Sequence, residues 1–147
     1  MDDASALLNT QLGGWNEAMG LRFVHATADK VVAELDVTRV HQQPYGIVHG
    51  GVHAGVIETL ASTGAALSAM TRNQTVVGLE NNTSFIRAVR GGRLTATALP
   101  ITRGRRTQVW ETTIVDATDQ VVAIGRVRLL CLDPGAAIAG ETAGVKG

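Results

Sequence analysis

A long run of small and apolar side chains, from Gly51 to about Met70, limits the possible folds more than any other part of the sequence. It consists almost entirely of Gly, Ala, Val, Ile, Leu, Ser and Thr. The run is too long for one strand, so we predict a helix. Each internal glycine lowers helix propensity by about 1 kcal/mol relative to alanine but permits very close packing. We therefore expect a central helix around which the rest of the chain wraps.

Period-two patterns and turn residues surround this helix. Before it, we expect a short, interrupted helix over residues 3–19, a hairpin over residues 21–40 that turns at residues 28–30, and a loop punctuated by Pro44 and Gly46. After it, strands are predicted at about Thr75–Phe85, Arg93–Thr102, Thr107–Asp116 and Val121–Leu132. The expected fold class is α+β, with an antiparallel sheet whose one face is covered by the long helix.

Composition places this fold in a single domain and excludes several classes of partner. A chain of 147 residues suits one domain over residues 1–147, with its core at about residues 21–132 and a flexible tail over residues 134–147. Thirteen basic residues balance thirteen acidic ones, so no global field attracts nucleic acid or an anionic membrane. No apolar run spans a bilayer and no secretory signal is evident, so we expect a cytoplasmic protein. The single cysteine, Cys131, is expected to be a buried packing thiol.

One carboxylate interrupts the apolar helix. Between Arg39 and Arg72, Glu58 is the only Asp, Glu, Lys or Arg. An ionised group is costly to bury unless it is paired, hydrogen-bonded or facing a wet cleft. Glu58 therefore either points to solvent or accepts a capping bond, or it lies in a cleft as a base or nucleophile.

The neighbours of Glu58 suit chemistry at a carbonyl group. Gly50 lies eight residues upstream at the expected helix start, where free backbone N–H groups favour a developing oxyanion. Ser62 follows one turn after Glu58, on the same helix face, and Gln43 in the preceding loop can donate to a carbonyl. These groups are the minimum for acyl transfer or hydrolysis.

Three segments also resemble a known family. The segments QPYGIVHGGVHAGVIETLASTGAA, VGLENNTSFIRAVRGGRLTATA and GRRTQVWETTIVDATDQVVAIGRVRLL are similar to hotdog-fold acyl-CoA thioesterases of the phenylacetate-degradation and 4-hydroxybenzoyl-CoA type. The resemblance runs from about Leu21 to Leu132. Its most specific part is HGG with an acidic residue eight positions after the first glycine. The glutamate leans slightly toward the 4-hydroxybenzoyl-CoA branch.

The resemblance implies roles for particular residues. Glu58 becomes the catalytic nucleophile or general base, Gly50 the oxyanion-hole glycine and Gln43 the side chain that orients the thioester carbonyl. Ser62 matches a Thr or Ser that some members have after the acid. The strand serine that other members use falls near Gly78 here. No metal or cofactor is implied.

The resemblance also implies assembly. Its members pair into dimers, and commonly tetramers, whose active sites are shared between subunits. Glu58 of one chain would then face Gln43 and Gly50 of its partner, and pairing would cover exposed edge strands. Arg103, Arg105 and Arg106 form the densest cationic cluster and are either a clamp for coenzyme A phosphates or an ordinary hairpin turn. Arg87 and Arg90 are weaker candidates.

The four histidines are expected to play smaller parts than Glu58. His49 and His53 are four residues apart, but no third ligand at familiar spacing completes a metal site. His49 is expected to stabilise its loop through backbone bonds, and we place it with Gly51 among the substrate-binding residues. His53 is expected near the cleft entrance or interface, and His25 and His41 at the surface or in loops. Asn82 is expected to make structural hydrogen bonds.

The leading hypothesis is hydrolysis of an acyl-CoA thioester, with an aryl or a medium to long fatty acyl group. Either Glu58 attacks the carbonyl to form an anhydride or it deprotonates water. The alternative is a non-catalytic acyl-CoA sensor on the same fold, although no additional DNA-binding domain is evident. A hotdog dehydratase or hydratase would need an Asp/His pair in its own motif, which we do not find.

Overall fold

The computed structural model describes residues 2–145. The chain begins with two short helices, a strand pair and a 3-10 turn, namely α1 (Ser5–Leu8), α2 (Gly13–Met19), β1 (Arg22–Ala26), β2 (Val31–Asp36) and η1 (Arg39–His41). The long helix and four long strands follow, namely α3 (Gly50–Met70), β3 (Thr75–Phe85), β4 (Arg93–Arg103), β5 (Thr107–Val115) and β6 (Val121–Leu132). Two short strands, β7 (Ala137–Ile138) and β8 (Glu141–Thr142), end the described chain.

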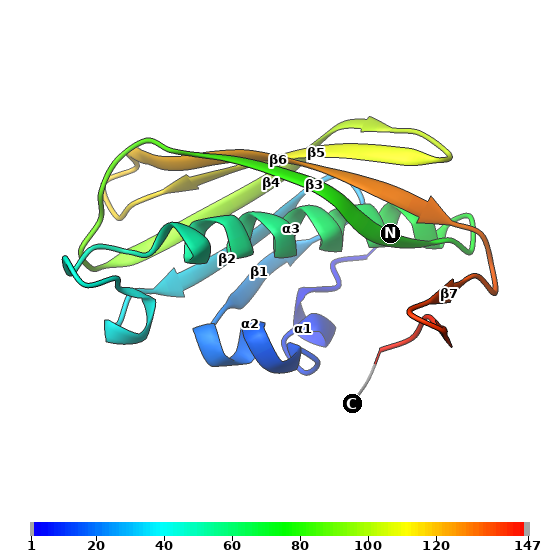
Figure 1. Cartoon of the computed structure of the whole chain (residues 1–147), viewed down its shortest axis with the longest axis horizontal. Coiled ribbons are helices and arrows are strands. Elements are labelled where there is room, and N and C mark those ends of the chain that lie inside the picture. The colour runs from blue at the N-terminus through cyan, green and yellow to red at the C-terminus, as the bar shows by residue number, and fades with distance from the viewer. Residues whose placement is uncertain (1, 146–147) are drawn as a thin grey trace.

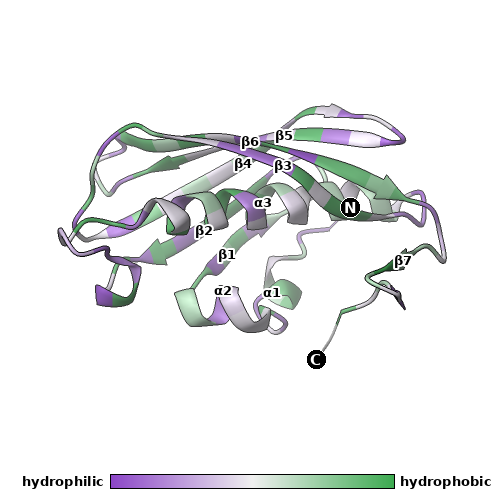
Figure 2. Ribbon diagram, in the orientation of Figure 1, coloured by the Kyte–Doolittle hydropathy of each residue, from purple (hydrophilic) through white to green (hydrophobic). Residues whose placement is uncertain are grey.

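Six strands form one antiparallel sheet in the order β1-β2-β4-β5-β6-β3. Helix α3 lies along one face of this sheet, and α1 and α2 lie below it on the same side (Figure 1). Hydrophobic and hydrophilic segments alternate along the strands, as expected for a sheet with one packed and one exposed face, while the Ala- and Gly-rich α3 is drawn mostly in pale colours (Figure 2). The predicted α+β class and the hotdog arrangement of one central helix on an antiparallel sheet are confirmed.

Two tryptophans explain why the central helix contains glycine. A Cβ atom at Gly55 would lie 2.4 Å from the ring of Trp15 in α2, and one at Gly64 would lie 2.5 Å from the ring of Trp110 in β5. Trp110 is fully buried, and its indole N–H donates to Gln108 at 2.9 Å. Any larger residue would force these rings away, so the helix accepts the propensity cost of glycine for close packing.

The two edges of the sheet differ. At the outer edge of β1, the N-terminal segment supplies hydrogen bonds. The side chain of Asn9 donates to the Phe23 carbonyl (2.9 Å) and accepts from the Phe23 N–H (2.8 Å). The Ala4 N–H donates to the Ala26 carbonyl and Asp3 accepts from the Ala26 N–H, both at 2.9 Å. This edge is therefore closed by the chain itself.

The edge strand β3 has no such cover within the described chain. It pairs with β6 on one side, and none of its residues is fully buried. Leu79, Phe85 and the following Ile86 are apolar and about half exposed or more. A long, open and partly apolar edge is a surface suited to pairing with another strand.

Several expectations for single residues can now be settled. Cys131 is buried, as predicted. His41 was expected at the surface or in a loop, but it is buried: it is 2% exposed, its Nδ1 accepts from the Thr38 N–H (2.8 Å), and its Nε2 bonds the Met19 carbonyl (2.7 Å). The imidazole therefore ties η1 to the end of α2, a contact between segments far apart in sequence.

The C-terminal segment and the expected cellular location can be compared with the structure only in part. The segment after Asp133 includes a small hairpin of β7 and β8, so it is not wholly irregular, and its flexibility stays a prediction. In residues 2–145, no helix has both the length and the apolar character needed to cross a membrane. The cytoplasmic location likewise stays a prediction.

Candidate active site

Glu58 lies at an open hollow between α3 and β3. The hollow has a volume of about 450 Å³ and is lined by Ala54, Gly55, Glu58, Asn81, Thr83 and Phe85. Ser62, one turn further along α3, donates a hydrogen bond to Glu58 Oε2 at 3.2 Å. No Lys, Arg or His of residues 2–145 forms an ion pair with this carboxylate. Glu58 is thus half-buried and held on one oxygen only.

Gly78 of β3 makes room for this carboxylate. A Cβ atom at Gly78 would lie 3.0 Å from Glu58 Oε2, which is tighter than ordinary van der Waals contact. Gly78, near which the resemblance puts the serine of other members, therefore lies directly beside the Glu58 carboxylate. Any water-positioning hydroxyl must come from elsewhere, and Ser62 is the hydroxyl already bonded to the acid.

Gly50 and Gln43 meet in a second cavity at the N-terminus of α3. This cavity has a volume of about 290 Å³. His49 caps the helix by accepting from the Gly51 N–H at Nδ1 (2.7 Å), as its predicted role in backbone bonding requires. The Val52 N–H donates to the His49 carbonyl (2.9 Å). The Gly50 N–H is left without an acceptor among the described residues, so it is free for a ligand.

The side chain of Gln43 also offers a free donor. Its Oε1 accepts a short bond from the Tyr45 N–H, which fixes the amide in the loop. No described residue accepts from its Nε2. The amide of Gln43 and the backbone N–H of Gly50 therefore line the same cavity as two unused donors, the arrangement that stabilises an oxyanion.

The two halves of the predicted site are separate within one chain. Gly50 and Glu58 are eight residues apart on a straight helix, which at roughly 1.5 Å per residue separates them by about 12 Å. Phe85 lines both hollows and packs over Gly50, where a Cβ atom would lie 2.7 Å from its ring. Gly50 and Glu58 of one chain therefore line different hollows, and the ring of Phe85 lies at both.

The predicted arginine cluster lies at the other end of the molecule. Arg103 donates to the Ala28 carbonyl (2.8 Å) and to Asp29 (2.6 Å), so it joins the β4–β5 turn to the β1–β2 turn. Arg105 and Arg106 are exposed in the same turn. Gln74, just after α3, donates to the Arg105 carbonyl at 3.1 Å, which places the turn near the C-terminal end of α3 and far from Gly50.

Sequence reasoning missed Asn81 at the site. Asn81, and not Asn82, makes the structural hydrogen bonds: its amide donates to the Ala54 carbonyl (3.0 Å) and its Oδ1 accepts from Thr83 (2.6 Å). A bulge between Gly78 and Glu80 shifts the alternation of β3 by one residue and places Asn82 on the outer face.

His53 agrees in position with its prediction but not in burial. It was expected near the cleft entrance or interface, and it does line the Gln43–Gly50 cavity. It is, however, only 4% exposed. The helical spacing from Gly50 was the one available signal, and sequence alone could not reveal the burial.

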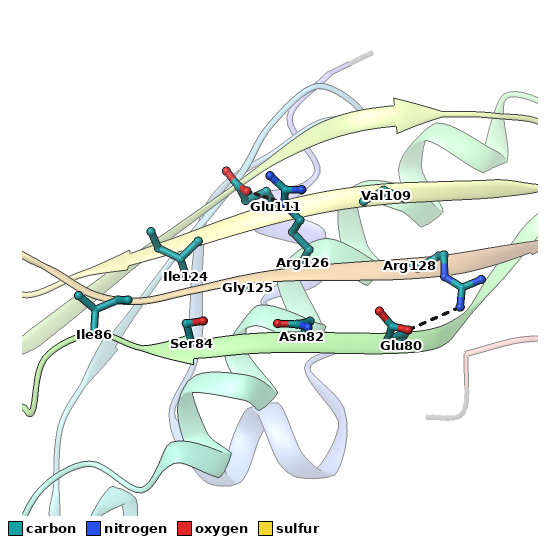
Figure 3. A pocket seen from close by; sticks show the side chains of 10 residues that line it. All are labelled: Glu80, Asn82, Ser84, Ile86, Val109, Glu111, Ile124, Gly125, Arg126 and Arg128. Atoms are coloured by element: carbon teal, nitrogen blue, oxygen red, sulfur yellow. Dashed lines mark hydrogen bonds and ion pairs between the residues drawn. The ribbon is translucent and has the colours of Figure 1, made fainter.

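A further hollow lies on the outer face of the sheet. It has a volume of about 580 Å³ and is lined from β3, β5 and β6 by residues that include Glu80, Asn82, Glu111, Arg126 and Arg128 (Figure 3). Arg126 pairs with Glu111 at 2.8 Å and Arg128 with Glu80 at 3.7 Å. None of the predicted catalytic residues lines this hollow. In residues 2–145, no group of three His, Cys, Asp or Glu side chains could hold a metal ion.

Comparison with known proteins identifies the class. Residues 45–123 match the family model described as Thioesterase superfamily, which is more than half of the chain. The Mycobacterium tuberculosis protein Rv1847 is 42% identical over 133 residues, covering 89% of this chain and 94% of the relative. Its structure aligns with a TM-score of 0.80. The chain therefore belongs to the Thioesterase superfamily and is a thioester hydrolase with the hotdog fold.

Two further proteins are similar over most of their length. The 1,4-dihydroxy-2-naphthoyl-CoA hydrolase of Listeria monocytogenes is 40% identical over 113 residues, covering 77% of this chain and 91% of the relative. The structure of thioesterase PA1618 from Pseudomonas aeruginosa aligns with a TM-score of 0.83 at 29% identity, covering 90% of this chain and 95% of that one.

Proposed function

We propose that the protein hydrolyses acyl-CoA thioesters at a site shared by two subunits. Glu58 comes from one subunit, and Gln43 and Gly50 come from the other. The observation that carries this proposal is the separation of about 12 Å between Gly50 and Glu58 along α3. A nucleophile and an oxyanion donor must both lie within about 3 Å of one carbonyl group, which a second chain permits.

The open edge of β3 supplies the means of assembly. Antiparallel pairing of two β3 strands would extend the sheet and cover the apolar edge. To exchange Gly50 and Glu58 between subunits, the two-fold axis must pass midway between them, close to Ala54. Asn81 bonds the Ala54 carbonyl, so β3 already lies beside that point. The assembly is such a dimer, or a tetramer of two such dimers.

The chemistry follows from the groups at the site. Glu58 either attacks the thioester carbon or takes a proton from water that does so. The Gly50 N–H and the Gln43 amide stabilise the oxyanion, and the C–S bond breaks to release the thiolate of coenzyme A. In the first route, water then hydrolyses the mixed anhydride on Glu58. Ser62 holds Oε2 and so orients the carboxylate in either route.

The test is release of free coenzyme A thiol from a panel of aryl-CoA and fatty acyl-CoA thioesters. Glu58→Ala should lower kcat at least about a hundredfold, the scale for loss of a base or nucleophile. Glu17→Ala, an exposed glutamate of α2, is the matched control and should retain activity. Coenzyme A binding without turnover of any thioester would overturn the proposal and leave an acyl-CoA sensor.

Isotopic labelling separates the two routes. In a single turnover in ¹⁸O-water, attack of water on the Glu58 carbonyl of the anhydride places label in the Glu58 carboxylate, whereas the general-base route places label only in the product acid. Peptide mass spectrometry of the enzyme would detect the label.

Arg103, Arg105 and Arg106 are the proposed contacts for the phosphates of coenzyme A. They lie near the C-terminal end of α3, which is about 18 Å from Glu58 along the helix. Arg105→Ala with Arg106→Ala should raise KM for acyl-CoA but not for the matching acyl-pantetheine, which lacks the nucleotide phosphates. An equal change of KM for both substrates would show that the arginines form an ordinary hairpin turn and do not contact the phosphates. His49 and Gly51 contribute by holding the helix start that presents Gly50.

A further inference from the structure

His53 is a buried histidine without a hydrogen-bond partner. It lies in the first turn of α3 and is 4% exposed. Its Nδ1 is buried and has no partner, and no described residue bonds its Nε2. Burial lowers the pKa of this imidazole, which therefore stays neutral at physiological pH. Buried polar atoms in proteins are nearly always hydrogen-bonded, so an orphaned imidazole needs an explanation.

The surroundings of His53 indicate where its partner would come from. His53 lines the same cavity as Gln43 and Gly50, three residues further along α3 than the proposed oxyanion donor. Much of the remaining wall is apolar and includes Ile47, Val48, Phe85 and Ile86. The ring of Phe85 lies 6.3 Å from that of His53, at an interplanar angle of 36°. The cavity thus combines an apolar wall with three polar side chains: Gln43, which is assigned to the carbonyl, the exposed Arg87 and the buried His53.

The expected tautomer of His53 presents an N–H donor to a bound ligand. An unsatisfied buried acceptor is less costly than an unsatisfied buried N–H. The proton is therefore expected on Nε2, with the buried Nδ1 as the empty acceptor. Nε2–H can then donate to an oxygen of a molecule bound in the cavity.

We propose that His53 selects the acyl group by donating a hydrogen bond to a hydroxyl or oxo oxygen placed close to the thioester carbonyl. This inference rests on the proposed function, because it takes Gly50 and Gln43 as the carbonyl site. The preferred substrates are then acyl-CoA thioesters with an apolar body and one such oxygen. Thioesters that lack the oxygen leave Nε2 unpaired and bind less well.

Two matched substrate pairs test the proposal. Salicyloyl-CoA is compared with benzoyl-CoA, and 3-hydroxyoctanoyl-CoA with octanoyl-CoA. The wild type should prefer the oxygen-bearing member of at least one pair by about 10- to 100-fold in kcat/KM, the scale of an unpaired buried polar group. His53→Leu should bring that ratio close to one, mainly through a higher KM for the oxygen-bearing member.

Two variants control this result. His53→Gln keeps an N–H near the position of Nε2 and should restore part of the preference. His25→Leu makes the same change at a histidine that is 40% exposed and lies outside the cavity, and should keep the wild-type ratio. Thermal unfolding of each variant checks folding, and Leu in place of an orphaned imidazole should not lower stability.

The outcomes are distinct from those that test the proposed function. No turnover of any thioester by the wild type would overturn the proposed function itself. Turnover without a preference in either pair would overturn the His53 inference alone. So would a His53→Leu effect that is equal on both members of a pair, because His53 would then contact a part that the substrates share, such as pantetheine.

Discussion

The two edge strands of the sheet, β1 and β3, differ in whether the rest of the chain covers their open side. Each lies at an edge of the sheet, and each carries an apolar side chain, Val24 or Leu79, that is 47% exposed. The N-terminal segment closes β1 with the side chains of Asn9 and Asp3. Within the described chain nothing closes β3, and β3 is the strand beside Glu58. The comparison supports the proposal that the β3 edge is left open for assembly, because this edge lies beside the proposed catalytic acid.

A lysine introduced at each of the two edges should give the largest expected effects on association and activity. The two effects should also differ strongly from each other. Leu79→Lys should weaken subunit association and lower thioesterase activity about tenfold or more, because charged residues are disfavoured in the core of an interface. Val24→Lys makes the same change at an equally exposed position on the closed edge and should leave both properties near wild type. Analytical ultracentrifugation and a coenzyme A release assay measure the two properties. Equal effects of the two changes would remove the distinction between the edges.

Opening the closed edge should cost stability and not activity. Asn9→Ala removes the two hydrogen bonds to the Phe23 backbone and should destabilise the protein by about 1–2 kcal/mol. Urea denaturation would measure this change. The specific activity of the folded protein should be retained, since β1 lies away from Glu58 and Gly50. A loss of activity without a loss of stability would contradict the assignment of separate roles to the two edges.

The smallest expected effect is a pH-dependent contribution of Asp3 to the stability of the fold. The N–H groups of Ser5 and then Ala26, each bonded to its carboxylate, lower the pKa of Asp3 from 3.8 to about 2. A carboxylate with a depressed folded-state pKa adds stability that is fully present above pH 3.8 and is lost as the pH falls toward 2. Urea denaturation of wild type and Asp3→Asn should therefore give a difference that shrinks over this window. A difference independent of pH would assign the effect to geometry instead of charge.

Hydrophobic periodicity and composition predicted the main helices and strands well, because both depend on residues that are close together in the sequence. The Ala- and Gly-rich run is helical from Gly50 to Met70, one residue longer than expected, and the four later strands agree within about one residue with the alternation. The small residues of the helix were read correctly as a sign of close packing, which Trp15 and Trp110 provide.

Features that depend on distant contacts could not be predicted. The strand order, which places β3 at an edge, arises from pairing across the whole chain. The bulge after Gly78 moved the structural asparagine from Asn82 to Asn81, and one displaced residue reverses the face of every side chain beyond it. His41 was expected at the surface or in a loop and His53 near the cleft entrance or interface; His53 does line a cavity, but the burial of both side chains was not predicted.

The most direct test of a site shared across the β3 edge is complementation between two inactive variants. Glu58→Gln and Gln43→Ala chains are mixed, allowed to exchange subunits and assayed for thioester hydrolysis. A shared site predicts recovery, because each mixed dimer contains one site with both Glu58 and Gln43 intact. Random exchange should then give about one quarter of wild-type activity. If the mixture stays as inactive as either variant after exchange of subunits has been verified, each site lies within a single chain and the account is contradicted.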